Sequence, residues 1–557
     1  MQCPSGTGPA GRQGLSRDTG RKGFLANRAA KLEGDRRKRK GATHKPWRQL
    51  NRDQREVAKR LSAGQVTLVT VSGWGFVAGF LAFLDEIGFY ALLDIEGQGF
   101  TRVMVPIARL IMTYQMKVLM GIGSINLVPS RLFRQTALMK LIGYTTTEMA
   151  AGFCQRGDLS GGPMHKNTLA DAVERLTAEE LEQILNETAS RLRARGFFKG
   201  SKGHFALDGS DLETTAKYSG AGARKYTEWK VDHKEKKAVE VERLAFGFKV
   251  LIVYEVHLRL VVAAKVVPIN EHESKFTLTL VRQAQKNLGE GVLRVLLMDR
   301  GFLDGEALWV LKAELGIDFV VPSKDKMRVT EDARGLCRKA EDGESLFKGE
   351  RRGKRKVGKT GKVKWEGQLS VAGVANLASY DQYGDEEHAR QANRKDFDGN
   401  AINAVVVTKW QGDEYKVGDE KVFLSSLPVD SPLEVLDLYD LRSLIENTAF
   451  RELKQGWNLK RYPKKTEAAV IGHTFLTLLT FTLANAFRSS LGRELARHGI
   501  RRQRAEQEDG NVIVFAGDYY AIFHIEEVFI LLGVVPEVLL RASPDEVRRR
   551  YRLPVAA

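Results

Sequence analysis

The strings HFALDGSD (204–211) and LRVLLMDRGF (293–302) decide the fold of this chain. Each begins with a short apolar run and continues into an acid, Asp208 in the first string and Asp299 in the second. Short apolar runs are typical of buried strands, and α/β sheets place functional groups at the ends of such strands, where the strand core fixes their position. We therefore predict two buried strands, each with an acid at its end.

The segments around these strings predict a sheet with helices packed against it. Residues 244–268 are rich in Val and predict two more strands, and residues 317–323 predict another. Residues 276–289 predict a helix that ends at a glycine, and residues 305–316 an amphipathic helix with Asp304 as its N-cap. Strands that are followed by helices in this order indicate an α/β fold with a mixed sheet.

Shifts in composition divide the chain into parts with different predicted structures. The predicted parts are a basic, disordered arm over 1–60, a mostly helical region over 61–199 that we expect to bind DNA, a core over 200–325 and 431–490, a β-rich insertion with a basic loop over 326–430, and a helical segment over 491–557. Within the helical region, Thr177 and Glu180 have the spacing of a capping box and predict a helix start.

The positive charge is concentrated in two stretches. The chain carries 87 Lys and Arg against 69 Asp and Glu, a net charge of +18. Residues 11–60 contain 17 Lys and Arg against 5 Asp and Glu, and residues 348–364 contain 9 against 1, so the remainder is close to neutral. Such runs attract a polyanion by releasing its counterions, and nucleic acid is the usual one. The alternative is that the N-terminal run only keeps the protein soluble.

Composition and targeting signals exclude several other classes of protein. Hydrophobic residues make up 43% and charged residues 28%, which is typical of globular proteins and excludes collagen-like, mucin-like and wholly disordered chains. Cys3, Cys154 and Cys337 lie far apart, so we expect neither a disulfide framework nor a cysteine-rich zinc site. We expect a cytoplasmic, nucleoid-associated protein without a secretory signal. The uncharged residues 63–84 are long enough to span a bilayer, but their polar residues and glycines favour a strand, a turn and a buried helix.

A third acid, Glu446, lies in the string YDLRSLIEN (439–447). At 100° per residue, an ideal helix here places Tyr439, Arg442 and Glu446 on one face and apolar residues on the other. A helix beside an active site needs such a polar face. The alternative is that Arg442 and Glu446 form an ordinary i,i+4 ion pair on the surface.

Three carboxylates that meet in space would repel one another strongly, and a divalent cation removes that repulsion. Hard oxygen ligands suit Mg²⁺ or Mn²⁺, and two such ions can catalyse phosphodiester transfer. Other acids are weaker candidates. We interpret Asp211 and Glu213 as loop acids or as residues that surround the metal ligands, the string Glu271-His272-Glu273 as a polar turn, and His473 as a packed residue on an apolar helix.

The three acids and their surroundings resemble the DDE transposases of bacterial insertion sequences, in particular the insertion-sequence-four type. That branch has the signature Tyr-x2-Arg-x3-Glu-x6-Lys, and Tyr439, Arg442 and Glu446 match it in spacing. LDGS (207–210) resembles the first-acid strand and MDRGF (298–302) the second. The resemblance covers about residues 200–490. It departs from the signature at Leu453, where the family has Lys, and at Ser443, where the family often has Trp.

The resemblance implies a function for each matching residue. Asp208, Asp299 and Glu446 would be the catalytic acids of an RNase H-like core and would hold two Mg²⁺ or Mn²⁺ ions. Tyr439, Arg442, Lys454 and Arg451 would contact DNA phosphates, with Lys454 or Arg451 in place of the missing signature Lys.

The implied reaction is cleavage of double-stranded DNA at the ends of the element, followed by joining of the 3′-OH to target DNA. The resemblance also implies a homodimer that holds two ends together, with no membrane partner. The alternatives are a nucleic-acid-binding protein without catalytic activity, and a decayed transposase that has kept only its fold.

Overall fold

The structure is a computed structural model of the chain, and it describes most of the residues from Leu50 onward. The described residues are 50–66, 68–71, 75–100, 105–153, 162–231, 238–341, 350–357, 363–385, 400–410, 419–497, 511–524, 528 and 531. The predicted disordered arm lies outside them up to residue 49, and so does much of the C-terminal segment.

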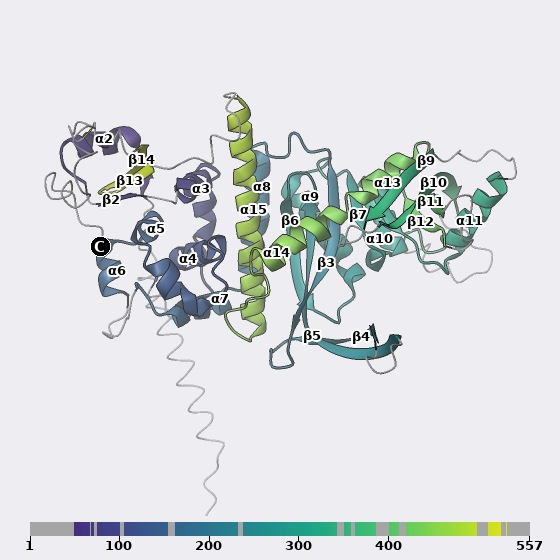
Figure 1. The fold of residues 1–557 in the computed structure, drawn as a ribbon, viewed down its shortest axis with the longest axis horizontal. Coiled ribbons are helices and arrows are strands. Elements are labelled where there is room, and N and C mark those ends of the chain that lie inside the picture. Colours follow the sequence, from purple (N-terminus) through teal and green to yellow (C-terminus); the bar gives the residue numbers. More distant parts are fainter. Residues whose placement is uncertain are drawn as a thin grey trace, which may run out of the picture.

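A ten-stranded mixed sheet forms the larger half of the molecule (Figure 1). Its order is β4-β5-β3-β7-β8-β12-β11-β10-β9, and β6 pairs with β5. The strands are β3 (His204–Thr214), β4 (Gly222–Val231), β5 (Ala238–Glu255), β6 (Leu260–Pro268), β7 (Val295–Met298), β8 (Asp318–Pro322), β9 (Glu350–Val357), β10 (Val363–Leu377), β11 (Ile402–Trp410) and β12 (Lys421–Ser425). The mixed α/β sheet expected from the sequence is therefore confirmed.

The two strings that carry Asp208 and Asp299 form neighbouring strands. β3 and β7 are parallel, and their pairing runs from His204 with Val295 to Leu207 with Met298. The pairing thus ends one residue before each acid, so the two acids follow paired positions. β7 pairs in parallel with β8 in turn, and β3 is antiparallel to β5. The parallel strands are buried, as their continuous apolar sequences predict.

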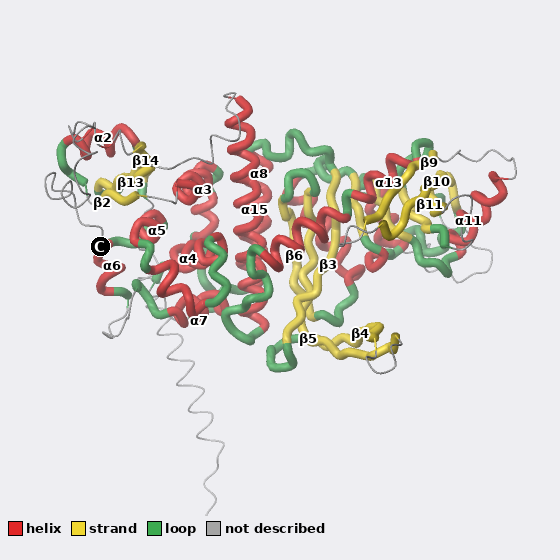
Figure 2. The backbone as a smooth tube through the Cα atoms, in the orientation of Figure 1, coloured by secondary structure: helices red, strands yellow, loops and turns green. Residues whose placement is uncertain are grey.

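Helices cover this sheet and form the other half of the molecule. α8 (Ala178–Ala194), α9 (Thr277–Leu288) and the long α15 (Glu467–Arg497) all pack on β6. α15 and α8 lie between the sheet and a set of N-terminal helices (Figures 1 and 2). These are α3 (Gly75–Glu86), α4 (Ile107–Leu119), α5 (Thr136–Leu141), α6 (Thr146–Ala151) and α7 (Lys166–Arg175). The helical structure predicted for this region is confirmed, as is the capping box at the start of α8, where Thr177 and Glu180 exchange both bonds.

The predicted β-rich segment over 326–430 extends the sheet. β12, β11, β10 and β9 continue it from β8, each antiparallel to its neighbour. The basic stretch expected as a loop or hairpin lies largely on β9 and β10, with residues 358–362 outside the described part. The segment also contains a helix, α11 (Arg328–Glu341), which its predicted β-rich character did not indicate. Its buried Val329 and Ala333 pack it against the sheet, although its sequence is mostly polar.

The two ends of the chain meet in a second, four-stranded sheet of order β1-β14-β13-β2. Its strands are β1 (Asn51–Arg52), β2 (Leu68–Val71), β13 (Asn511–Ala516) and β14 (Tyr519–His524), and α2 (Gln54–Ser62) covers it with Val57 and Leu61. Two predictions were wrong here. Residues 51–60 are folded rather than part of a disordered arm, and 511–524 is a hairpin rather than helical.

The hairpin has a clear physical cause that the sequence contains. NVIVFA and YYAIFH are rich in β-branched and aromatic residues, and Gly517 between them adopts φ 62° in the turn. β2 pairs with β13, so the strand predicted around residues 65–71 is confirmed and its partner comes from the opposite end of the chain.

One helix among the described residues is long and apolar enough to cross a membrane. It is the part of α15 from Glu467 to Ser490, and 94% of its most apolar window is buried within the protein. Its apolar side chains pack against α4, α7, α8 and β6, which accounts for their hydrophobicity. The uncharged stretch that we weighed over 63–84 forms β2 and most of α3, a helix of 12 residues.

Gly472 of α15 tests this packing, because α7 crosses the helix at that point. A Cβ on Gly472 would lie 2.3 Å from the carbonyl oxygen of Val173. We expect Gly472→Ala to lower the free energy of unfolding by about 1–2 kcal/mol, although alanine itself favours a helix by roughly 1 kcal/mol. Gly335→Ala on α11 is the matched control, since nothing lies within 4 Å of its added Cβ. Urea unfolding should show the control to be neutral or stabilised, and equal effects at both sites would contradict the packing.

Candidate active site

Asp208 lies on β3 and is almost completely buried, with 5% of its surface exposed. The backbone N–H of Gly209 donates to its Oδ1 at 2.8 Å, which fixes the orientation of the carboxylate. The other oxygen, Oδ2, points toward the helices that follow the β-rich segment. β3 runs from His204 to Thr214, so Asp208 lies inside this strand and not at its end as predicted; only the pairing of β3 with β7 stops before it.

Asp299 occupies the corresponding position after β7. It is the N-cap of a short 3-10 helix, η5 (Arg300–Phe302), and the N–H of Arg300 donates to its Oδ1 at 2.7 Å. Its side chain is 46% exposed. Both acids are thus oriented by the backbone N–H that directly follows them, and both directly follow the last paired residues of the β3–β7 ladder.

Glu446 reaches the same place from an irregular helix. α13 (Pro432–Asp440) ends before it, and a π-helix, η6 (Ile445–Phe450), contains it. The regular helix that we expected through Tyr439 and Glu446 is wrong. The backbone between them tightens, because Arg442 N–H donates to the Tyr439 carbonyl and Ile445 N–H to the Arg442 carbonyl, both at i→i−3 spacing.

Arg442 brings the three acids together. Its Nη1 donates to Asp208 Oδ2 at 3.2 Å, and Nη1 and Nη2 donate to Glu446 Oε1 at 2.9 and 2.8 Å. Nη2 also lies 3.6 Å from Asp299 Oδ1, and Nε donates to the Tyr439 hydroxyl at 3.3 Å. The i,i+4 pair with Glu446 that we kept as an alternative is present, but it is one arm of a larger cluster and not a surface pair. The cluster spans 239 residues of sequence, from 208 to 446.

Burial governs the charge of this cluster. It raises the pKa of Asp208 to about 7, and the nearby carboxylates of Glu446 and Asp299 act in the same direction. The charge of Arg442 and the Gly209 N–H oppose that rise without cancelling it. The pKa of Arg442 itself is raised, because the attraction of Asp208 and its other anionic neighbours outweighs burial, which lowers it. Positive charge near these carboxylates therefore stabilises the cluster.

The other signature residues surround the cluster. Tyr439 is half-buried, and its ring packs on Phe423 of β12 with centroids 4.6 Å apart. Leu453, which stands where the signature has Lys, is fully buried, whereas Lys454 is half-buried and Arg451 exposed. Burial lowers the pKa of Lys454, and its electrostatic neighbours include Asp211, Glu213 and Asp208. Asp208 is thus one of the charged groups around Lys454, whereas Arg451 is exposed.

The weaker candidates fall into different classes. Asp211 and Glu213 lie on β3 itself, so the loop position was wrong, whereas their role as neighbours of the site stays a prediction. They accept bonds from Tyr226 and Arg243, which sequence reasoning missed. His473 is packed as predicted, because it is fully buried with both ring nitrogens bonded, to Tyr114 and to the Asn458 carbonyl.

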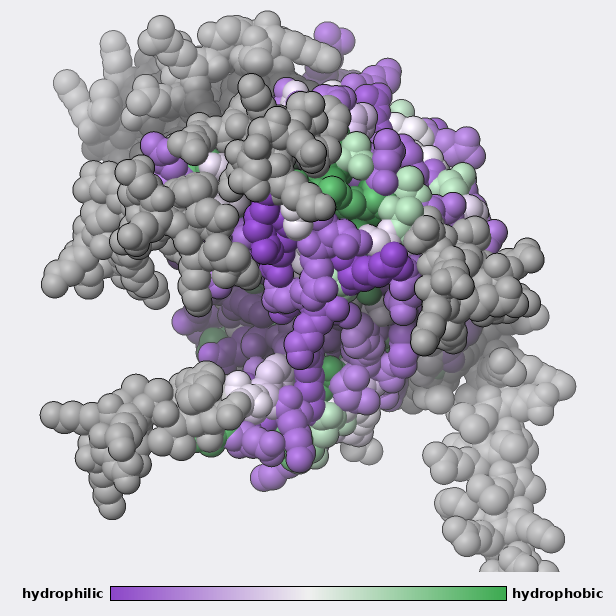
Figure 3. Space-filling view, turned by 90° about the vertical axis from the view of Figure 1, so that its right-hand side faces the viewer, coloured by the Kyte–Doolittle hydropathy of each residue, from purple (hydrophilic) through white to green (hydrophobic). Residues whose placement is uncertain are grey.

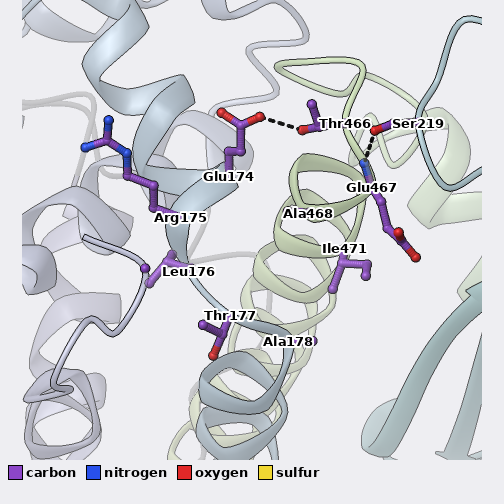
Figure 4. Close-up of a pocket in the computed structure, with 11 residues that line it drawn as sticks. Glu174, Arg175, Leu176, Thr177, Ala178, Ser219, Thr466, Glu467, Ala468 and Ile471 are labelled. Carbon is purple, nitrogen blue, oxygen red and sulfur yellow. Dashed lines mark hydrogen bonds between the residues drawn. The ribbon is translucent and has the colours of Figure 1, made fainter. Parts of the chain in front are cut away.

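A pocket of about 570 Å³ lies where α7 ends and where α8 and α15 begin, and none of the three acids lines it (Figure 4). Its polar groups satisfy one another. Thr466 Oγ1 donates to Glu174 at 2.8 Å, and the Glu467 N–H donates to Ser219 Oγ at 3.3 Å. Arg175 points away from Thr466 and Glu467. The pocket lies between helices, and its lining contains no group of side chains comparable with the three acids and Arg442.

The donor chemistry of the cluster fits a hard divalent cation. Three carboxylates from three elements converge on one cationic group, and one of them is buried enough to resist ionisation without a counter-charge. The guanidinium now occupies the centre. Accordingly, among the residues that the structure describes, no three His, Cys, Asp or Glu side chains are close enough to share an ion. An ion and Arg442 would therefore compete for the same oxygens.

Comparison with known proteins identifies the class and then the family. A mixed α/β protein with acids clustered where two parallel strands stop pairing is a candidate phosphoryl-transfer enzyme. The sequence profile of the family described as Transposase DDE domain matches residues 199–483, which is more than half of the chain and includes all three acids. The chain belongs to this family of transposases.

Other comparisons are more distant. The cryo-EM structure of the piggyBac transposase synaptic complex with hairpin DNA is similar, with a TM-score of 0.31 and 10% identity over 85% of this chain and 87% of that chain. This likeness is too low to assign a function. A search of curated proteins finds no match.

The raised pKa of Asp208 predicts a pH-dependent stability. Between the ordinary value of 3.8 and about 7, the folded protein binds more protons at this site than the unfolded chain, so folding weakens as the pH rises through that window. Asp208→Asn does not titrate. We expect the unfolding free energy of the wild type to fall relative to the variant by about 1.4 kcal/mol per pH unit within the window and to level off above it. Urea unfolding without divalent ions measures the difference, and a constant difference from pH 4 to 8 would contradict the assigned burial effect.

Proposed function

We propose that this protein is a DNA transposase of the insertion-sequence-four type that cuts the ends of its element and joins the 3′-OH to target DNA. The observation that carries the proposal is the convergence of Asp208, Asp299 and Glu446 on one cationic centre. Family membership supports the reaction class, and the spacing of Tyr439, Arg442 and Glu446 supports the branch.

The strand arrangement supports an RNase H-like catalytic core. Strands β6, β5 and β3 are antiparallel neighbours, and β7 and β8 follow in parallel beyond β3. The segment from β9 to β12 enters the chain between this core and the helix of Glu446, where the resemblance places an insertion. In this proposal the insertion lengthens the sheet and leaves the acid edge of β3 and β7 intact.

The three acids would hold two Mg²⁺ or Mn²⁺ ions, which when bound activate a water or 3′-hydroxyl and stabilise the leaving oxygen. Around them, the chain orients two carboxylates through the N–H groups of Gly209 and Arg300. Arg442 neutralises the acids before DNA arrives. Its planar fork of donors also suits a phosphate, so we infer that it transfers from the carboxylates to the DNA backbone.

Lys454, Arg451 and Tyr439 would contact phosphates beside the cleaved bond. The support is that Asp208 is among the charged neighbours of Lys454 and that Arg451 is exposed on the same short helix, α14 (Arg451–Gln455). The described residues on the face shown in Figure 3 are mostly hydrophilic, with a smaller hydrophobic patch among them. We further propose that residues 61–199 contribute DNA binding, that two copies hold the two ends, and that the protein acts on the nucleoid in the cytoplasm.

Replacing the acids tests the proposed chemistry. We expect Asp208→Ala, Asp299→Ala and Glu446→Ala each to slow Mg²⁺-dependent cleavage of the element's ends by at least about 10³-fold, or roughly 4 kcal/mol of barrier, while DNA affinity is retained. Gel-based cleavage and mobility-shift assays on the same DNA measure the two properties.

Asp304→Ala is the control, because this acid caps α10 (Gly305–Ala313) through the Ala307 N–H and touches none of the three acids' partners. It should cost about 1 kcal/mol of stability and leave cleavage unchanged. Persistent cleavage in the acid variants would refute the assignment. DNA binding without cleavage by the wild type would favour the non-catalytic or decayed protein instead.

Competition between Arg442 and the ions gives a second test. We expect Arg442→Gln to bind Mn²⁺ more tightly than the wild type without DNA at pH 8.5, where protons compete least, because the guanidinium no longer occupies the carboxylates. Arg451→Gln, on the exposed side of the same segment, should leave Mn²⁺ affinity unchanged. Calorimetry measures both, and weaker Mn²⁺ binding in Arg442→Gln would show that the arginine assists ion binding instead of opposing it.

A further inference from the structure

A buried ion pair lies close to Asp208 and Asp299 and has no part in the chemistry above. Lys249 of β5 and Glu273 of the 3-10 helix η4 (Glu273–Phe276) are joined by an Nζ to Oε1 distance of 2.7 Å. Their side chains are 3% and 20% exposed. Lysine is almost never buried to this extent without a partner, so the pair fixes where the Glu273 carboxylate lies.

The Glu273 carboxylate touches the backbone next to both acids. A Cβ built on Gly209, the residue after Asp208, would lie 3.1 Å from Glu273 Oε1. A Cβ built on Gly301, two residues after Asp299, would lie 2.8 Å from Glu273 Oε2. One carboxylate therefore rests against both segments, which is a physical reason for glycine in the strings LDGS and MDRGF.

The ion pair lies where the hydrogen bonds of the sheet no longer connect these two segments. The ladder between β3 and β7 ends at Leu207 and Met298, so hydrogen bonds of the sheet do not set the separation of the residues beyond. The contacts of η4 with η5 continue the connection past that point. Glu273 lies where the ladder stops and the acids begin.

The pair supports the acids from the opposite face of β3. Side chains alternate along a strand, so Gly209 and Asp211 face away from Asp208. Lys249 is the cross-strand partner of Asp211, and Leu251 that of Gly209, which places the ion pair on that opposite face. Glu273 is therefore no fourth ligand beside Asp208, and its influence passes through the backbone.

We propose that Lys249 and Glu273 are positioning residues that set the spacing of Asp208 and Asp299 for divalent-ion binding. This inference rests on the proposed function, because it assumes that the two acids share ions. Groups that hold metal ligands in place are worth about 10- to 100-fold in metal affinity when they are removed. The pair would act by holding the two segments at one separation.

The test measures Mn²⁺ binding to the full chain without DNA, by calorimetry and by the electron paramagnetic resonance of the ion, beside thermal unfolding. We expect Glu273→Gln to weaken Mn²⁺ binding by about 10-fold or more. Glu273→Asp keeps the charge but shortens the reach to the two glycines, so it should bind Mn²⁺ as weakly as Glu273→Gln. Full rescue by Glu273→Asp would show that charge, not position, matters and would overturn the proposal.

Arg109→Met provides the matched control. Arg109 and Glu148 form an ion pair at 2.8 Å in the helical half, with side chains 11% and 28% exposed, so its loss should lower the unfolding temperature comparably. We expect this control to bind Mn²⁺ as the wild type does. If Glu273→Gln binds Mn²⁺ within about twofold of the wild type, or if Arg109→Met weakens binding equally, the positioning role is refuted.

Two further variants keep the test decisive. If Glu273→Gln fails to fold, the double variant Lys249→Met and Glu273→Met removes both charges, a change that is often neutral for stability. This double variant should still bind Mn²⁺ more weakly, because no ion pair then holds the two segments in place. Asp208→Asn separates the two proposals. If it binds Mn²⁺ like the wild type, the proposed function fails, whereas loss of binding in Asp208→Asn but not in the Glu273 variants refutes only the positioning role.

Discussion

The interaction of one guanidinium with three carboxylates is the constraint on which the site depends. Asp208, Asp299 and Glu446 come from a strand, a strand end and a π-helix, and without a cation between them their charges would drive these elements apart. Arg442 supplies that cation from the same helical segment as Glu446. Arg442 offsets only part of the negative charge, because the pKa of Asp208 stays raised, and in the proposed function metal ions would supply further positive charge.

In this fold, two of the acids come from paired strands of the sheet, and an irregular helical segment carries the third acid and the arginine. Parallel pairing of β3 and β7 ends one residue before Asp208 and Asp299 and so brings these two acids close together, and helices α8, α9 and α15 pack on β6 in the same half of the sheet. The third acid and the arginine sit on a backbone that departs from regular helix geometry. π-Helical turns are rare and are frequent at functional sites, and here one widens the helix exactly where a side chain must reach a strand.

Elements distant in sequence complete the molecule in ways that local patterns do not specify. The strands near residues 51 and 68 pair with a hairpin from residues 511–524, so the two ends of the chain form one small unit under α2. β4 has no clear apolar alternation, yet it is a strand because the long β5 extends beyond β6 and offers it an open edge. In both cases the partner strand supplies the hydrogen bonds that the sequence of the segment alone does not call for.

The sequence by itself determined the strands of the core and the helix caps at Thr177 and Asp304, because apolar runs and capping spacings are local patterns. It also indicated Asp208, Asp299 and Glu446 as candidate acids, the third by its match to a family signature. The tertiary structure alone decided that Asp208 is buried, that Arg442 lies among all three acids, and that Lys249 and Glu273 brace two of them from behind. Burial and ion pairing depend on which segments distant in the sequence come into contact, and the order of residues within one segment does not show this. For this reason the string Glu271-His272-Glu273 was interpreted from the sequence only as a polar turn, whereas the structure places the Glu273 carboxylate against Gly209 and Gly301.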